Sequence, residues 1–421
     1  MSDWKEYKLG ELATFYNGRA YKNGEFKTSG TPIVRIQNLT GEGKTVYSDL
    51  QLDENKYIEN GDLIYAWSAT FGPYIWRGEK SIYHYHIWKI VCNEKIIDKF
   101  YFYYKLKLIS DSLKDNGNGS IFVHITKSFM ENFKIKIPSL EKQKYISNIL
   151  SNLDKKIRFN TQINQTLEQI AQALFKSWFV DFDPVRAKVQ ALSDGLSLEQ
   201  AELAAMQAIS GKTPEELTAL SQAQPDRYAE LAETAKAFPC EMVEVDGVEV
   251  PKGWEIKPIE LILDRLKNKQ KLRKEEISFE GTIPVFEQGA SILMGYHDKD
   301  AAFNASIDEP IFIFGDHTCI TKLSTIPFSI YQNVIPLIGK NLPTYWVYCA
   351  IQNKQTFQEY RRHWAELIVK EVFVPDNINL CQYFSKKVKE LFFKIDINYQ
   401  ENKTLIETRD LLLPKLLNGE I

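Results

Sequence analysis

The chain contains an internal repeat, and this repeat constrains the fold more than any single motif does. A long amphipathic helical pattern over residues 141–178 recurs 238 positions later, over residues 379–417, and a block rich in aromatic residues precedes each copy. Six positions match in residue type between the copies: Leu153 and Leu391, Ile157 and Ile395, Asn160 and Asn398, Asn164 and Asn402, Leu167 and Leu405, and Leu174 and Leu412. Because such a repeat is one structural unit, we expect two similar domains, each followed by a long helix.

The two helical patterns favour an antiparallel helix pair. Their apolar positions alternate steps of three and four residues, which is the 3.5-residue period of a coiled coil. Asn160 and Asn164 interrupt the first apolar seam near its midpoint, and Asn398 and Asn402 interrupt the second. Since midpoints meet in an antiparallel pair, we expect these asparagines to face each other and to fix the register. The alternative is that they point to solvent.

Composition and turn signals divide the chain into five segments. Short β-like runs alternate with turn residues in both aromatic blocks, and each block also contains a helical pattern. We therefore expect an α+β fold: two domains of mixed β-sheet and helices, separated by a long antiparallel two-helix coiled coil, with a pseudo-two-fold internal repeat. The predicted segments are a first domain (1–138), a first long helix (139–182), an acidic Ala- and Glu-rich helical insert or linker (183–249), a second domain (250–376) and a second long helix (377–421).

The charge of the chain is unevenly distributed. The net charge is −3, but residues 181–250 contain 14 acidic and 5 basic residues, so the rest of the chain carries +6. Binding to a polyanion depends on where charge lies, so the average does not exclude a nucleic-acid partner. No run approaches the ~18 apolar residues of a membrane span, and no basic-then-apolar signal peptide is apparent, so we expect a cytoplasmic location.

Catalytic and metal-binding motifs fail on their spacing. A sequence ending at Thr213 resembles a phosphate-binding loop, but Met206 stands where that loop requires glycine. His84 and His86 share one face of a predicted strand without a third ligand nearby. The five cysteines include no Cys-x-x-Cys pair, which argues against a zinc site or a disulfide framework. We expect no catalytic residue, no metal site and no cofactor in this chain.

The remaining polar residues fit recognition of DNA bases. Arginine contacts guanine, and glutamine and asparagine contact adenine, through pairs of major-groove hydrogen bonds worth ~1–3 kcal/mol each. Similar residues follow β-like runs in both domains, although each alone is as consistent with an ordinary loop residue. The candidate DNA-binding residues are Arg35, Gln37, Asn38, Trp67, Ser68, Thr70, Tyr83, His84 and Lys127 in the first domain, and Gln288, Asp316, His317, Thr318 and Lys322 in the second.

Three segments carry a resemblance to a known family. Each domain ends in a strand closed by proline, and the first copy continues into a long helix with a glutamine and an isoleucine in fixed places. The segments are Ile135-Lys136-Ile137-Pro138 with Gln143 and Ile146, residues 173–184, and the tail 409–421. Together they resemble the specificity (S) subunit of bacterial type I restriction–modification enzymes over nearly the whole chain. In the second copy Gln382 lies one position away from the place that matches Gln143.

The resemblance implies two target-recognition domains, each recognising one half of a bipartite DNA site. It implies that the paired helices act as a spacer and dock two methyltransferase (modification) subunits, with restriction and translocation subunits in the full complex. S-adenosylmethionine, ATP and magnesium would then belong to those partner subunits. The sequence thus predicts a non-catalytic, sequence-specific DNA-binding subunit. The alternatives are a two-domain protein-binding adaptor with a coiled-coil spacer, and a stand-alone nuclease.

Overall fold

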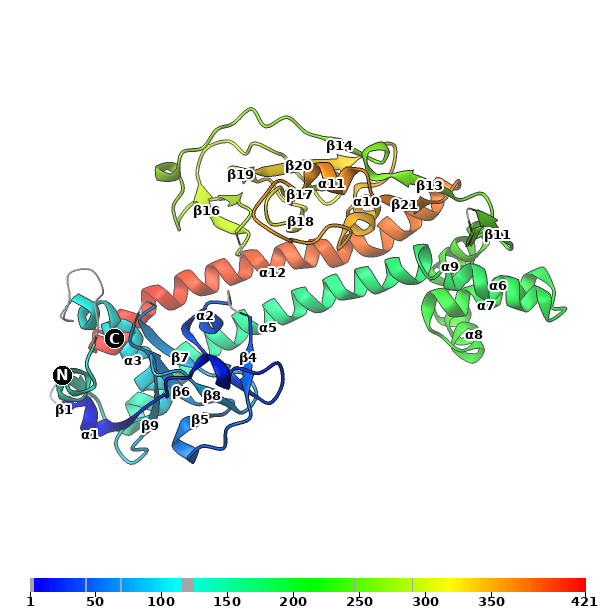
Figure 1. Ribbon diagram of the computed structural model, residues 1–421. Coiled ribbons are helices and arrows are strands. Elements are labelled where there is room, and N and C mark those ends of the chain that lie inside the picture. The colour runs from blue at the N-terminus through cyan, green and yellow to red at the C-terminus, as the bar shows by residue number, and fades with distance from the viewer. Residues whose placement is uncertain (1–3, 42–43, 69, 116–124, 246, 290) are drawn as a thin grey trace. The chain divides into compact units, whose positions relative to one another are not determined.

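The computed structural model describes residues 4–41, 44–68, 70–115, 125–245, 247–289 and 291–421. The chain forms two compact units: unit 1 is Met1–Phe159 with Glu401–Ile421, and unit 2 is Asn160–Gln400. Two long helices, α5 (Leu140–Phe179) and α12 (Ile378–Asn418), are divided between the units (Figure 1). One part of each helix belongs to unit 1 and the other part to unit 2. No helix among the described residues has an apolar stretch long enough to cross a membrane.

The described residues of unit 1 form three small sheets. An antiparallel pair joins the start of the first domain to its end, a four-stranded sheet follows the order β2-β9-β6-β7, and a second follows β4-β3-β8-β5. The strands are β1 (Lys5–Lys8), β2 (Ala13–Asn17), β3 (Thr31–Val34), β4 (Val46–Ser48), β5 (Tyr57–Ile58), β6 (Leu63–Ala66), β7 (Gly72–Ile75), β8 (Ser81–Tyr83), β9 (Ile87–Cys92) and β10 (Lys134–Ile137). The helices are α1 (Leu9–Leu12), η1 (Asn23–Glu25), α2 (Ile36–Leu39), η2 (Glu54–Lys56), α3 (Lys99–Asp115) and α4 (Lys127–Asn132).

Unit 2 repeats this plan. Its four-stranded sheet has the order β14-β20-β17-β18, and a three-stranded sheet has the order β16-β15-β19. The strands are β11 (Met242–Val245), β12 (Val248–Pro251), β13 (Glu255–Pro258), β14 (Leu263–Arg265), β15 (Ile283–Phe286), β16 (Leu293–His297), β17 (Ile311–Gly315), β18 (Thr321–Ser324), β19 (Ser329–Ile330), β20 (Val334–Gly339) and β21 (Glu371–Val374). The other helices are α6 (Asp183–Ser193), α7 (Leu198–Ser210), α8 (Pro214–Ala223), α9 (Pro225–Ala237), η3 (Ile259–Leu261), η4 (Lys274–Glu276), α10 (Thr344–Ile351) and α11 (Trp364–Ile368).

Backbone hydrogen bonds show which residues of the two domains correspond. In the first domain the N–H of Asn93 donates to the carbonyl of Leu12 (2.8 Å), and in the second the N–H of Lys340 donates to Ile262 (2.9 Å). Leu12 and Ile262 both lie directly before the edge strand of the four-stranded sheet, and Asn93 and Lys340 both lie directly after its neighbour. Counting along the paired strands from these bonds gives further correspondences: Ile90 with Leu337, Leu63 with Phe312, and Ile75 with Leu323.

The antiparallel direction of the long helices is visible within each unit. In unit 1, Arg409 forms an ion pair with Asp154 (2.8 Å), and Asn402 Nδ2 donates to the carbonyl of Ile157 (3.4 Å). In unit 2, Asn164 Nδ2 donates to the carbonyl of Ile395 (3.3 Å). Residue numbers therefore rise along α5 as they fall along α12. The predicted α+β fold class with an antiparallel helix pair is confirmed.

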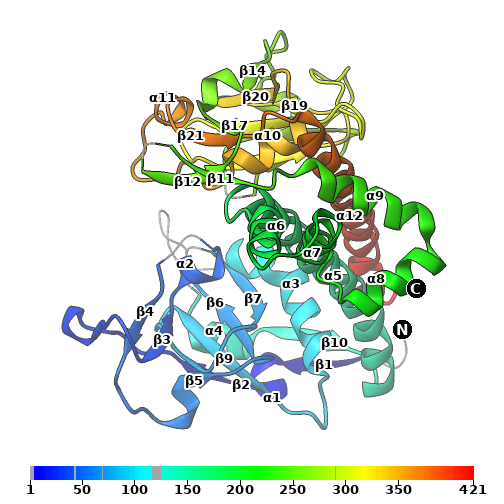
Figure 2. The same ribbon diagram turned by 90° about the vertical axis from the view of Figure 1, so that its right-hand side faces the viewer.

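The acidic insert folds as helices α6 to α9 at the C-terminal end of α5 (Figure 1). The β11–β12 hairpin lies beside α6 (Figure 2). Val185, Leu231 and Phe238 of the insert belong to the same buried core as residues of the second domain. The ring of Phe238 packs edge-on against Trp178 at 5.4 Å. This segment is therefore packed rather than a solvated connector. The division into five segments stays a prediction.

Asp396 on α12 ties the second domain to its helix. The carboxylate is 2 % exposed and accepts hydrogen bonds from the N–H and the hydroxyl of Thr325 (2.6 and 2.8 Å). Lys322 Nζ lies 3.4 Å from the same carboxylate and 4.2 Å from the ring of Tyr399. Since these groups satisfy a buried charge, removing one of them leaves the others unpaired in the core.

We expect Asp396→Ala to lower the free energy of unfolding by about 3 kcal/mol, because it strands the buried Lys322 ammonium and the Thr325 donors. The matched control is Asp308→Ala, which removes the exposed partner of Lys389 (78 % exposed carboxylate) and should cost less than about 1 kcal/mol. Chemical denaturation of both variants measures the difference. Equal losses would show that the Asp396 contacts contribute nothing special to stability.

Candidate nucleic-acid interface

In the first domain, three loops at strand ends are joined by backbone hydrogen bonds. They are residues 35–41 after β3, 67–70 after β6 and 84–86 after β8, and their described residues are called the first loop cluster. The N–H of Trp67 donates to the carbonyl of His86 (3.1 Å), and the N–H of His84 donates to Val34 (2.9 Å). These bonds bring the predicted residues Arg35, Trp67 and His84 together.

Aromatic rings cover this cluster. Trp67 lies edge-on to His86 (5.2 Å between centroids), and Tyr85 lies 4.3 Å from His84 and 3.9 Å from His86. Trp67 Nε1 donates to the carbonyl of Tyr85 (2.9 Å), which holds the indole in place. Tyr85 is 39 % exposed. Tyr85 and His86 are members of the site that the sequence prediction omitted, although the run Tyr83-His84-Tyr85-His86 was a visible signal.

The polar groups of the first loop cluster are suited to hydrogen bonding. Burial lowers the pKa of His84 to about 4, with smaller contributions from His86 and Arg35, so its imidazole is neutral at pH 7. Arg35 donates from Nη2 to the carbonyl of Lys44 (2.8 Å), while its buried Nε has no hydrogen-bond partner among the described residues. Asn38 Oδ1 accepts from the N–H of Arg35 (2.9 Å), and Gln37 is exposed beside it. Ser68 and Thr70 are half-buried in the β6–β7 loop.

The second domain places Gln288, Asp316, His317 and Thr318 in the corresponding loops, and Lys322 in strand β18. Residues 287–289 follow β15, residues 316–319 follow β17, and with residues 359–363 they are called the second loop cluster. Gln288 Oε1 accepts from the N–H of His317 (2.9 Å), and the ring of His317 lies edge-on to Tyr360 (4.8 Å). A Cβ atom at Gly315 would lie 2.7 Å from Thr318 Oγ1. Glycine at this position therefore allows the close approach of the loop.

His317 and Thr318 carry buried polar atoms without partners. Both ring nitrogens of His317 and the hydroxyl oxygen of Thr318 have no hydrogen bond within the described part of the chain. An unsatisfied buried donor or acceptor costs ~1–3 kcal/mol, and such groups usually have a ligand or an ordered water as their partner. These atoms therefore lack the hydrogen-bond partner that a ligand or an ordered water would supply.

The buried carboxylate of Asp316 holds the second loop cluster in place through hydrogen bonds to backbone N–H groups. Its Oδ1 accepts from the N–H groups of His363 (3.2 Å) and Trp364 (3.0 Å) at the start of α11, and Oδ2 lies 3.7 Å from Arg362 Nε. Asp316 is buried and positions the loop, so it is not itself an exposed contact residue. Tyr360 and Arg362 were missed in the sequence, where the aromatic and basic run at 360–364 was their signal.

Three predicted residues have other partners. Tyr83 is fully buried and its hydroxyl donates to the carbonyl of Asn55 (2.6 Å). Lys127 lies at the start of α4, which packs against α1, and pairs with Glu131 (3.5 Å). Lys322 is held by Asp396, as described above. None of the three belongs to a loop cluster.

The four predicted register residues are buried in the helix pair. Within unit 2, Asn398 Nδ2 donates to Asn164 Oδ1 (2.7 Å), and Asn160 is 1 % exposed. Within unit 1, Asn402 donates to Ile157, as noted. They do not point to solvent, and their role in setting register stays a prediction.

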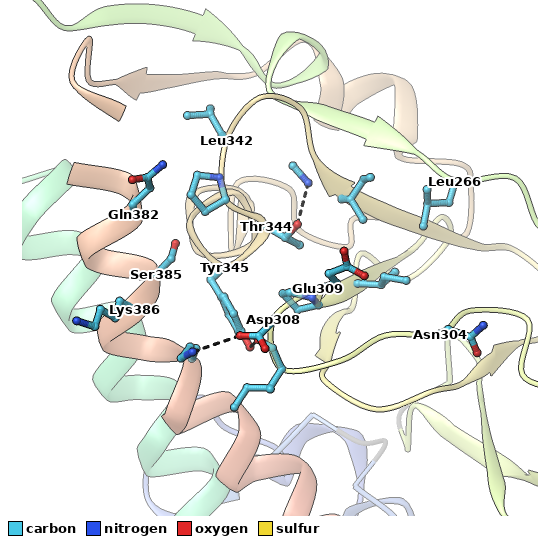
Figure 3. A pocket seen from close by; sticks show the side chains of 17 residues that line it. Leu266, Asn304, Asp308, Glu309, Leu342, Thr344, Tyr345, Gln382, Ser385 and Lys386 are labelled. Atoms are coloured by element: carbon cyan, nitrogen blue, oxygen red, sulfur yellow. Dashed lines mark hydrogen bonds and ion pairs between the residues drawn. The ribbon is translucent and has the colours of Figure 1, made fainter. Parts of the chain in front are cut away.

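A cavity of about 650 Å³ lies between α12 and the second domain. Asp308 and Lys389 pair across it (3.3 Å), and the hydroxyl of Thr344 accepts from Gly339 N (3.2 Å) (Figure 3). Its lining includes no residue of the second loop cluster, so we assign it no part in contacting DNA. Over the described residues, no group of three or more His, Cys, Asp or Glu side chains is placed to hold a metal ion.

Comparison with known proteins identifies the family. The type I restriction modification DNA specificity domain matches residues 1–169. The type I restriction enzyme HindI specificity subunit of Haemophilus influenzae is 38 % identical over 465 aligned residues, covering 100 % of both chains. The chain belongs to the type I restriction enzyme specificity subunits.

Two further specificity subunits are similar to the chain at lower identity. The MjaIX specificity subunit of Methanocaldococcus jannaschii is 24 % identical over 359 residues, covering 79 % of this chain and 71 % of that protein. The crystal structure of the type I restriction–modification S subunit from M. genitalium superposes with a TM-score of 0.51 at 15 % identity, covering 98 % of this chain and 96 % of that one. This structure supports the fold.

We expect Arg35→Ala and Gln288→Ala each to lower the preference for specific over random DNA by ~1–3 kcal/mol, because each removes a hydrogen-bonding group of one loop cluster. Competition binding of the assembled complex with the two kinds of DNA measures this preference. Lys127→Ala is the control and should leave the preference unchanged. Equal weakening on both kinds of DNA would make Arg35 and Gln288 phosphate contacts instead.

Proposed function

We propose that this specificity subunit is the non-catalytic, sequence-specific DNA-binding component that directs methylation and restriction by partner subunits to a bipartite DNA site. One observation carries the proposal. The same domain occurs twice in one chain, and the loop cluster of each copy contains buried polar atoms that lack hydrogen-bond partners within the described residues. The residues in those loops differ between the copies, so each domain is expected to recognise a different half-site.

The chemistry of the two loop clusters fits base edges in a groove of DNA. Arg35 and Gln37 supply donors and acceptors in the first cluster, and Gln288, His317 and Thr318 supply them in the second. Neutral His84 is a hydrogen-bonding group and not a phosphate-binding cation at pH 7. Phosphate contacts position a protein on the duplex, whereas contacts to base edges give specificity.

The partners follow from the family. Two methyltransferase subunits would dock on the helix pair, and restriction and translocation subunits would complete the enzyme in the cytoplasm. S-adenosylmethionine, ATP and magnesium would be bound by these partners. The names of the related specificity subunits support this division of labour.

Salt dependence tests DNA binding against the adaptor alternative. Binding to DNA releases counterions, so the logarithm of affinity should fall linearly with the logarithm of salt concentration, with a slope of about −0.9 per phosphate contacted. The measurement is titration of a fluorescent duplex carrying the specific site, between low and physiological salt. Binding that is weak on every duplex, with strong salt-independent capture of a protein partner, would favour the adaptor.

Exchange of one domain tests independent recognition. Replacing residues 1–138 by the matching segment of another specificity subunit should change one half of the methylated sequence and leave the other half unaltered, because each loop cluster lies within its own domain. Sequencing of methylated sites in cells that express the hybrid with its partner subunits measures both halves. A hybrid that alters both half-sites would contradict separate recognition.

Lengthening the helix pair tests its role as a spacer. A seven-residue insertion after Asn160 in α5, with another after Glu401 in α12, preserves the apolar seam and adds ~10 Å to the pair. One base pair occupies ~3.4 Å of duplex axis, so the gap between half-sites should grow by about three base pairs. A seven-residue insertion after Gly211, in the loop between α7 and α8, is the control and should leave the gap unchanged. An unaltered gap in the helix variant would mean that the helices do not set the spacing.

A further inference from the structure

A cavity in unit 1 contains positive charge that no described residue neutralises. It has a volume of about 280 Å³ and lies between β7, α3 and α5, where Arg77, Lys155 and Arg158 line it with Tyr74 and Tyr103. None of these three basic side chains has an ion pair or hydrogen bond with a described residue. Burial and the nearby Arg158 lower the pKa of Arg77. The two guanidinium groups are therefore close enough to repel each other.

The acidic residue in the wall of this cavity does not compensate for them. Asp154 forms an ion pair with Arg409 (2.8 Å), and its other oxygen accepts from the hydroxyl of Tyr104 (2.6 Å). Its charge is thus balanced on the side of α12. The cavity keeps an excess of positive charge.

The internal repeat shows what fills the corresponding place in unit 2. Arg158 corresponds to Asp396, 238 positions later in the second long helix. The strand correspondence of Ile75 with Leu323 makes Arg77 the counterpart of Thr325. In unit 2 these counterparts are bonded to each other, because the Asp396 carboxylate accepts both hydrogen bonds of Thr325.

Tyr74 of the first domain corresponds by the same count to Lys322, the cation of the Asp396 ion pair. The cavity that Lys322 and Asp396 help to line is only about 50 Å³. In the second domain, therefore, a carboxylate occupies the space between strand and helix. In the first domain the strand and the helix both present arginine there, and the carboxylate is missing.

We propose that a carboxylate side chain of a partner subunit binds between Arg77 and Arg158, in the place that the Asp396 carboxylate takes in the second domain. This inference rests on the proposed function, since it assumes that partner subunits assemble on the chain. Guanidinium groups bind carboxylates through paired, charge-assisted hydrogen bonds. Burying such a pair at an interface fixes the orientation of the partner.

The position of the cavity favours a protein partner over a DNA phosphate. Arg77 follows the C-terminal end of β7, whereas the first loop cluster adjoins the N-terminal end of the same strand. The remaining walls come from α3 and from the long helix α5. Contact at this place would distinguish one end of the helix pair from the other, because the matching place in unit 2 is closed.

The test transfers the closed arrangement of unit 2 to unit 1. The variant Arg77→Thr with Arg158→Asp should bind the methyltransferase subunits at least ~10-fold more weakly, measured by titration of labelled chain and by mass of the assembled complex. Its melting temperature should equal or exceed that of the original chain, since the repulsion between the arginines is gone. Arg158→Lys, which keeps the charge, should stay within ~3-fold. Lys95→Asp changes an exposed residue of unit 1 and is the control for charge reversal.

The outcomes separate this inference from the proposed function. If the original chain assembles and the double variant assembles equally well, the carboxylate site is wrong while the function stands. A different outcome is that the double variant assembles normally but binds random DNA more weakly and with a shallower dependence on salt. In that case the cavity binds a phosphate, and the inference is also wrong. If the original chain itself does not bind the methyltransferase subunits, the proposed function fails instead.

Discussion

The apolar seams of two long helices are the constraint on which the structure depends, because neither helix can bury its seam alone. In unit 1, Leu150 of α5 and Leu417 of α12 enter one core with the first domain. In unit 2, Phe175 of α5 and Phe384 of α12 pack edge-on at 5.6 Å in the core of the second domain. Each helix thus serves both cores, and the duplicated sequence supplies the partner that each seam requires. The domains could not keep these cores if either helix were lost.

Buried polar groups then differ between the two copies of this scaffold. Gln143 joins the start of α5 to the first domain. Its side chain donates to the carbonyls of Ile96 and Pro138 and accepts from the N–H of Asp98. Its counterpart 238 positions later is Cys381, which is fully buried. The start of α12 therefore lacks the hydrogen bonds that Gln143 makes at the start of α5, which fits the displacement of Gln382 by one position. The repeat preserves apolar positions more strictly than polar ones, since many side chains can fill a core but each hydrogen bond needs its own geometry.

This distinction explains how far the sequence predicts the molecule. The helix period and the α+β class follow from apolar spacing, and the antiparallel direction follows from the asparagines at the midpoints of both seams. Strand parity also explains why Tyr83 is buried in the core while its neighbour His84 is only half-buried. The roles of Asp316 and Lys322 were not predictable, because each depends on a residue distant in sequence: His363 for the first and Asp396 for the second. Loop residues take their direction from such contacts and not from a period.

Some polar and charged side chains of this chain have no partner among the described residues. The two ring nitrogens of His317 are buried without partners among the described residues, and Arg77 and Arg158 line one cavity without an ion pair there. Asp396 shows that this fold can satisfy a charge at the very place where Arg158 leaves one open. Residues that break a local rule in this way mark functional sites when a ligand restores the balance. By the same reasoning we propose that the loop clusters contact DNA and that the arginine cavity binds a protein partner, since the first lie at strand ends with hydrogen-bonding side chains and the second lies against α5.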